Sequence, residues 1–96
     1  MDVEQIKKIR LLLVDDEVDF RKTLAKRLLK RGIATLQTGD GDACLALLAD
    51  HPMDVVVMDV KMPGMSGLEV LKAIRNCQPE LPVVLITGYA AIDNAV

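Results

Sequence analysis

The sequence predicts a small α/β domain in which helices cover both faces of a parallel sheet. Four short apolar runs alternate along the chain with segments of helical spacing, the order that right-handed βαβ crossovers produce. The first of these runs is continuously apolar, as a strand buried on both faces is. A length of 96 residues allows one domain, which we expect to cover residues 1–96.

The first strand and helix are predicted from composition and spacing. Ile9 to Val14 reads as a buried strand. Phe20, Leu24 and Leu28 then recur every four residues, which indicates the apolar face of a helix, and Gly32 follows as a C-cap. Cations stand between and just after these positions, at Arg21, Lys22, Lys26, Arg27 and Lys30. The helix dipole favours the cations of the last turn.

The middle of the chain is predicted to supply two strands and one helix. Ile33 to Thr38 is a weak second strand, and a turn follows over residues 39–41. Ala43 to Ala49 fits a strand or a helix by periodicity alone, but its alanine and leucine content favours a helix. Val55 to Met58 is nearly all β-branched and is predicted as the third strand, which ends in an acid, Asp59.

The last third of the chain begins with a loop, Met62 to Gly67, whose proline and glycines are expected to shape the surroundings of Asp59. Ser66 stands three residues before Glu69, which fits the capping box of a third helix. Val83 to Ile86 is predicted as a fourth buried strand, and a further helix is expected from Ala90 onward.

Charge and cysteine usage exclude several classes of function. The net charge is −2 and the cations are scattered, so we expect no direct contact with nucleic acid. No stretch is long enough to span a bilayer. Cys44 and Cys77 form no CxxC motif, so neither a disulfide framework nor a zinc site is predicted, and a cytoplasmic location is expected. His51 lacks a supporting acid and is predicted to be a surface residue.

Polar residues follow the predicted strands at the edge where parallel sheets bind ligands. Asp15 and Asp16 follow the first strand, Asp59 ends the third, and Thr87 follows the fourth. Three neighbouring carboxylates repel one another, and a hard divalent cation such as Mg2+ resolves the conflict. Alternatively, the first two acids only cap the helix that follows them. The third acid, on another strand, argues against that alternative.

Three segments carry a resemblance to a known family. Residues 12–17 (LLVDDE), 59–67 (DVKMPGMSG) and 86–89 (ITGY) resemble the signature segments of the receiver domains of two-component response regulators. The resemblance covers essentially the whole chain. It implies a flavodoxin-like, doubly wound parallel sheet with strand order 2-1-3-4, and phosphorylation of Asp59 by a histidine kinase in the presence of Mg2+.

The resemblance also implies a role for each site residue. Asp16 is expected to bind Mg2+ directly, and Asp15 to bind it through water or to position it. Asp59 is expected to be both the nucleophile and a metal ligand, and the backbone carbonyl of Lys61 is the further protein ligand. Thr87 is expected to contact the phosphoryl group through its hydroxyl. Lys61 also lies at a position that tunes hydrolysis of the acyl phosphate in the family, as does Tyr89.

The chain departs from the family pattern at its end. Receiver domains continue with a fifth strand, which carries a lysine and an aromatic switch residue, and these positions have no counterpart before Val96. We therefore expect the strand Val83 to Ile86 to form an exposed edge that favours self-association. An effector domain is expected in a longer parent protein.

Two alternatives to a phosphate-responsive receiver remain at this stage. The first is a truncated receiver that acts as an interaction or self-assembly module without phosphate-dependent switching. The second is a phosphatase with an aspartyl nucleophile, which would need an acid two residues after Asp59, where Lys61 stands. We expect no turnover of an external substrate, only self-catalysed phosphotransfer and slow autodephosphorylation.

Overall fold

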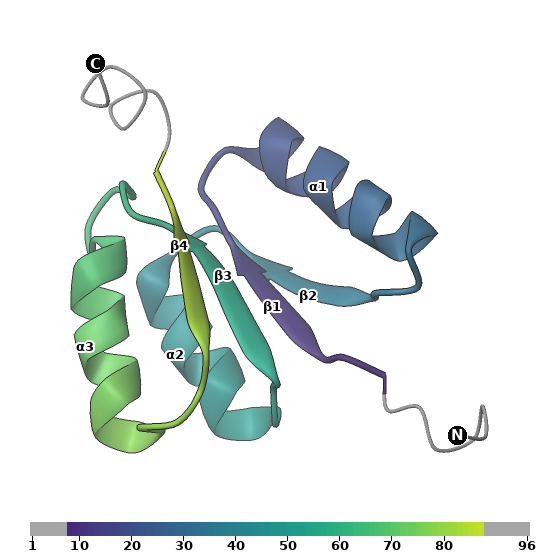
Figure 1. The fold of residues 1–96 in the computed structure, drawn as a ribbon. Coiled ribbons are helices and arrows are strands. Elements are labelled where there is room, and N and C mark those ends of the chain that lie inside the picture. The colour runs from purple at the N-terminus through teal and green to yellow at the C-terminus, as the bar shows by residue number, and fades with distance from the viewer. Residues whose placement is uncertain (1–7, 88–96) are drawn as a thin grey trace, which may run out of the picture.

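The computed structural model describes residues 8–87, which form one four-stranded parallel sheet and three helices (Figure 1). The strands are β1 (Leu11–Val14), β2 (Thr35–Thr38), β3 (Val55–Asp59) and β4 (Val83–Ile86). The helices are α1 (Val18–Lys30), α2 (Gly41–Asp50) and α3 (Gly67–Cys77). The strand order is β2-β1-β3-β4, which confirms the predicted α/β fold and its 2-1-3-4 order.

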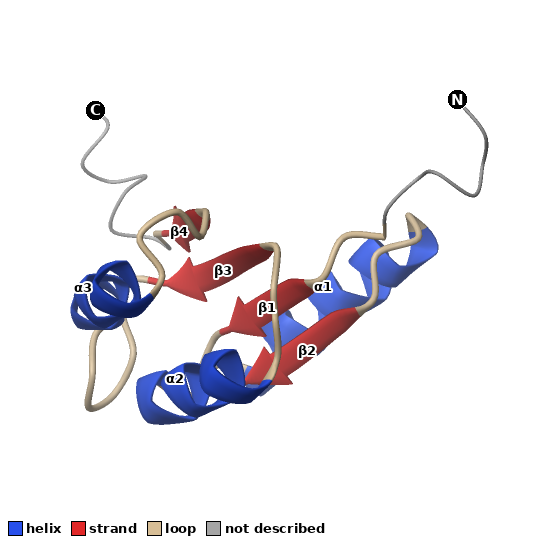
Figure 2. Ribbon diagram, turned by 90° about the horizontal axis from the view of Figure 1, so that it is seen from below, coloured by secondary structure: helices blue, strands red, loops and turns tan. Residues whose placement is uncertain are grey.

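The chain reverses its direction of travel across the sheet after β2, and this places helices on both faces. Helix α1 connects β1 to its neighbour β2, whereas α2 carries the chain back past β1 to β3. With crossovers of one hand, a reversed direction puts the helix on the other face. Figures 1 and 2 show α1 on one side of the sheet and α2 and α3 together on the other.

The hydrophobic core lies between the sheet and the pair α2 and α3. Alternate residues of the central strands point to this side, including Leu12, Val56 and Met58, all fully buried. Val70 and Ile74 of α3 meet them with exposed fractions of 0% and 1%. Burial of this kind contributes roughly 1.5 to 3 kcal/mol for each large side chain, so this side dominates the stability of the fold.

Helix α1 packs less deeply than its spacing predicts. It contacts β1 and β2, where Leu24 and Leu28 are half-buried, but Phe20 remains 46% exposed. In the part of the chain that the structure describes, no residue of α1 is fully buried. The expectation that Phe20 belongs to the core-facing stripe is therefore wrong, because α1 alone covers this side of residues 8–87.

The ends of the elements follow the local sequence closely. Gly32 has a φ of +85° and donates to the Leu29 carbonyl at 2.9 Å, which ends α1 in a left-handed cap as predicted. Asp40 caps α2 by accepting from the backbone N–H of Ala43 at 2.7 Å. The predicted capping box of Ser66 and Glu69 is present at the start of α3.

Some predicted bounds differ from the observed ones by one or two residues. The first strand begins at Leu11, because Ile9 is 50% exposed, and the second begins at Thr35. The segment Ala43 to Ala49 is a helix, and it extends by two residues at its start and one at its end. The helix expected from Ala90 lies outside the described residues. None of the helices within residues 8–87 has the length and apolar character needed to cross a membrane.

Candidate functional site

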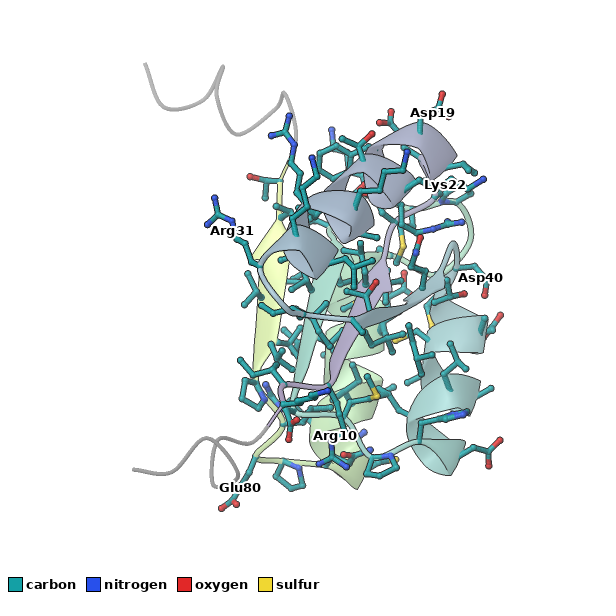
Figure 3. The ribbon with its side chains drawn as sticks, turned by 90° about the vertical axis from the view of Figure 1, so that its right-hand side faces the viewer. Arg10, Asp19, Lys22, Arg31, Asp40 and Glu80 are labelled. Carbon is teal, nitrogen blue, oxygen red and sulfur yellow. The ribbon has the colours of Figure 1, made fainter. Side chains whose placement is uncertain are left out.

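The candidate site lies where β1 and β3 end side by side. Val14, the last residue of β1, pairs in register with Met58, so Asp15 and Asp59 leave the sheet at the same level. Asp15, Asp16 and Asp59 each offer one carboxylate oxygen, and these three oxygens lie within 4.8 Å of one another. The structure thus brings together the three acids that the sequence predicts. Figure 3 shows the opposite end of the sheet marked by Arg10 and Glu80.

Asp15 is the most enclosed of these acids, with an exposed fraction of 4%. Its backbone N–H donates to the Thr38 carbonyl of β2 at 3.1 Å, and its Oδ1 accepts from the Glu17 N–H at 2.9 Å. Burial raises the pKa of this carboxyl above its ordinary value. The Glu17 hydrogen bond opposes the rise, and the charges of Asp59 and Asp16 add to it. Asp15 is therefore a buried acid in a site with excess negative charge.

Asp59 is held by the backbone of the loop that follows it. Its Oδ1 accepts from the Lys61 N–H at 3.2 Å, which fixes the orientation of the carboxylate. Gly67, the first residue of α3, donates its N–H to the Val60 carbonyl at 2.9 Å. A Cβ on Gly67 would lie 2.4 Å from the Asp59 carbonyl oxygen, so only glycine allows this approach. The loop after β3 is thereby closed tightly behind Asp59.

Thr87 lies at the same end of the sheet but outside the acid cluster. It follows Ile86, the register partner of Asp59, and the Val60 N–H donates to the Ile86 carbonyl at 3.0 Å. Its side chain is exposed. The expected contact of its hydroxyl with a phosphoryl group remains a prediction, as does the carbonyl contact of Lys61. Tyr89, which is expected to tune the site, lies outside the described residues.

The structure adds Arg21, which sequence reasoning did not assign to the site, and it gives a specific contact to Gly67, which was expected only as part of the loop that shapes the site. Gly67 allows the close approach behind Asp59, and Arg21 donates to the Asp15 carbonyl at 2.8 Å. A glycine at the start of a helix is a signal, because its helix propensity is poor. A cation near the start of α1 is another, because the helix dipole disfavours it there. The atoms that Arg21 contacts belong to the loop after β1 and to β2, and the spacing of residues along the chain does not reveal such contacts.

The acid cluster fits a hard divalent cation. Its donors are carboxylate oxygens, which Mg2+ prefers. The ligand oxygens of one octahedral Mg2+ lie about 3 Å apart when adjacent and about 4 Å apart when opposite. Separations of up to 4.8 Å are close to these values, so small rotations of the three side chains would meet them. A cation would also relieve the repulsion that adds to the effect of burial on the pKa of Asp15.

A family model described as the response regulator receiver domain matches residues 11–96. The chain is 40% identical over 87 residues to the regulatory protein AtoC of Escherichia coli. The aligned segment covers 91% of this chain and 19% of AtoC. The chain therefore spans about a fifth of the length of that relative.

Solved structures agree with this match. The response regulator protein TrrA of Thermotoga maritima, in complex with Mg2+ and BeF, has a TM-score of 0.82 and 32% identity, over 92% of this chain and 76% of that one. TrrA in complex with the histidine kinase ThkA has a TM-score of 0.80 and 34% identity, over 84% of this chain and 70% of that one.

Proposed function

Because the chain belongs to the family of receiver domains of two-component response regulators, we propose that its Asp59 accepts a phosphoryl group. One observation carries this proposal, the cluster of Asp15, Asp16 and Asp59 within 4.8 Å at the carboxyl end of the sheet. The Lys61 N–H orients the Asp59 carboxylate, and Asp59 is half-buried, so it is more accessible to a phosphodonor than the buried Asp15.

The proposed reaction is an in-line displacement at phosphorus. An oxygen of Asp59 forms a bond to phosphorus as the N–P bond of a phosphohistidine breaks, and the histidine nitrogen keeps the electron pair and takes up a proton. A carboxylate is a weak nucleophile, so the reaction depends on how well it is placed. Gly67 and the Lys61 N–H supply that placement.

Asp15, Asp16 and Asp59 are proposed to hold Mg2+, with the backbone carbonyl of Lys61 as a further ligand. When bound, Mg2+ neutralises negative charge on the carboxylates and on the phosphoryl oxygens. The Thr87 hydroxyl is proposed to donate a hydrogen bond to one of those oxygens from the end of β4.

The proposed partners are a histidine kinase as phosphodonor and an effector domain within a longer protein. The first follows the complex of TrrA with ThkA, and the second follows the small share of AtoC that the chain covers. We further propose that the chain acts in the cytoplasm, where the buried Cys44 and the exposed Cys77 would both stay reduced. Its chemistry would be limited to its own phosphorylation and slow dephosphorylation.

Mass spectrometry after incubation with a small-molecule phosphodonor and Mg2+ tests the proposal. We expect the chain to gain one phosphoryl group. Hydroxylamine should remove it, because an acyl phosphate is a mixed anhydride whose carbonyl hydroxylamine attacks, which forms a hydroxamate and releases phosphate. Asp59→Asn should abolish the adduct, and chelation of Mg2+ should reduce its rate of formation by at least about tenfold.

Asp50→Asn is the matched control, because Asp50 is exposed and ends α2, away from the cluster. It removes the same charge and should label at the rate of the unchanged chain. A chain that gains no phosphoryl group, or one in which Asp59→Asn labels as well as Asp50→Asn, would overturn the assignment of Asp59.

A further inference from the structure

The side chain of Arg21 spans three segments of the molecule beside the acid cluster. Arg21 is the fourth residue of α1, and its Nη1 donates to the backbone carbonyl of Asp15 at 2.8 Å. Its Nε donates to the Oε1 of Gln37 at 3.3 Å. Because Gln37 belongs to β2, this one guanidinium joins the helix, the loop after β1 and the neighbouring strand.

The peptide groups of Asp15 are consequently held from both sides. The N–H of Asp15 donates to Thr38 and its carbonyl accepts from Arg21, while its carboxylate accepts from the Glu17 N–H. That carbonyl belongs to the peptide that joins Asp15 to Asp16. Arg21 therefore binds the backbone between the two neighbouring acids.

The hydrogen bond from Arg21 opposes the repulsion among the three acids. Three carboxylates with oxygens within 4.8 Å of one another favour any movement that separates them. Asp59 belongs to β3, whereas Asp15 and Asp16 lie in the loop between β1 and α1, which strand pairing does not hold. A charge-assisted hydrogen bond to that loop opposes the movement, because such bonds are roughly twice as strong as neutral ones.

The neighbouring glycine leaves space for the guanidinium. A Cβ on Gly39 would lie 3.0 Å from Arg21 Nη1, 3.7 Å from the Asp15 carbonyl oxygen and 3.9 Å from Asp16 Cα. The first distance is too short for an unstrained contact, whereas the other two are ordinary. A methyl group at position 39 would thus press on the guanidinium and leave the backbone of the acid pair in place.

We propose that Arg21 is a positioning residue that sets the affinity of the acid cluster for Mg2+ by holding the peptide between Asp15 and Asp16. It contacts neither the cation nor the phosphoryl group. The inference rests on the proposed function only through the cation site, and it concerns binding in the absence of any phosphodonor.

Isothermal titration of the 96-residue chain with Mg2+ tests the inference. Arg21→Met should raise the dissociation constant about tenfold, the lower end of what loss of an outer-shell partner costs. Arg21→Lys retains one donor for the Asp15 carbonyl and should recover part of the affinity. Lys22→Met is the matched control, because it removes the same charge from the next, exposed residue of α1 and should leave the constant within about twofold.

A double-mutant cycle with Gly39→Ala separates positioning from a general loss of stability. Gly39→Ala should weaken Mg2+ binding in the unchanged chain and have no further effect in Arg21→Met, because the group it displaces is gone. Gly32→Ala is a control for stability alone: its φ of +85° strains an alanine and nothing lies within 4 Å. It should lower the melting temperature without changing the dissociation constant.

Three results would overturn the inference: Mg2+ binding by Arg21→Met as tight as by Lys22→Met, additive effects in the cycle, or no Mg2+ binding by the unchanged chain. The proposed function fails differently. Suppose that the chain binds Mg2+, that Arg21→Met weakens this binding, and that the chain gains no phosphoryl group. This result would leave the inference intact and remove Asp59 as the acceptor.

Discussion

At the scale of single residues, Asp15 combines burial with the nearby negative charges of Asp16 and Asp59. Its carboxylate is buried beside two other acids, and burial raises its pKa. The Glu17 N–H compensates only in part. A raised pKa in the folded chain means that the folded state binds a proton more readily than the unfolded state does. Stability then falls as pH rises through the range between the two pKa values, and the penalty is complete above it.

Asp15→Asn should therefore stabilise the metal-free chain at neutral pH. The amide oxygen can still accept from the Glu17 N–H, while the buried charge is gone. We expect a gain on the order of 1 kcal/mol, which raises the melting temperature by about 4 to 8 °C in a domain of this size. Thermal unfolding followed by circular dichroism between about pH 3 and about pH 8 should show a smaller decline of stability with pH than in the unchanged chain.

Asp19→Asn provides the comparison for that experiment. Asp19 is exposed in the first turn of α1, where an acid is favourable, so its loss should lower stability by about 0.3 to 1 kcal/mol. With saturating Mg2+, the unchanged chain should melt at a higher temperature than Asp15→Asn, because the variant lacks one of the acids of the cluster. A metal-free Asp15→Asn variant that melts below the unchanged chain at neutral pH would contradict this account of Asp15.

The contacts that the sequence predicted differ in kind from those that it did not predict. Asp15, Asp16 and Asp59 were predicted to meet because parallel strands bring their carboxyl ends to one edge, so strand order alone decides the matter. Arg21 and Gly67 act through the backbone of other residues, at Asp15 and Asp59. Such contacts depend on rotamers and on the exact approach of two segments, which neither periodicity nor composition determines.

At the scale of the elements, the connection from β3 to α3 is constrained by close approaches of its backbone. The backbone of Gly67 lies against Asp59 and Val60, and on the same loop Met65 lies beside Gly41 at the start of α2. The sequence predicted the loop and the helix that follows it from proline, glycine and the capping box. It did not predict the close approach. The poor helix propensity of a glycine marks Gly67 as unusual but does not say which backbone atoms it meets.

Gly67→Ala should be destabilising although alanine is the better helix former. Helix propensity favours the change by about 1 kcal/mol, but the new Cβ would lie 2.4 Å from the Asp59 carbonyl oxygen and 2.9 Å from Val60 Cα. Relief requires movement of backbone, so we expect a net loss of about 1 to 3 kcal/mol in chemical denaturation. The rate at which Asp59 is phosphorylated should fall by at least about tenfold, since the nucleophile is displaced.

Gly32→Ala again separates stability from placement. It should cost about 1 kcal/mol through backbone strain at the end of α1, far from Asp59, and leave the labelling rate unchanged. Equal labelling rates for Gly67→Ala and Gly32→Ala would show that the approach of Gly67 does not position Asp59.

At the scale of the whole molecule, the two faces of the sheet are covered unequally. Val83 packs against the core beneath α2 and α3, whereas Val84, the next residue of β4, points to the other face and is 52% exposed. Within residues 8–87, β4 pairs with β3 alone. The exposed edge expected from the sequence is present in this part of the chain, and its association with a second copy remains a prediction.

We expect the 96-residue chain to self-associate as its concentration rises, through the outer side of β4. Val84→Lys should weaken this association about tenfold, because it removes a buried apolar side chain worth on the order of 1.5 kcal/mol and adds charge to an edge. Light scattering coupled to gel filtration measures the effect. Leu68→Lys, a change of similar exposure on α3, should leave association unaltered, and a chain that stays monomeric throughout would contradict the expectation.

The acid cluster draws its members from two different strands, and it therefore exists only while β1 and β3 pair in their native register. A slip of one residue would turn the Asp59 side chain to the opposite face of the sheet. A cation that needs all three acids consequently binds the folded chain alone, and by mass action it shifts the folding equilibrium towards that state. Cellular magnesium would then act on this domain twice, as a participant in its chemistry and as a selector of its correctly paired fold.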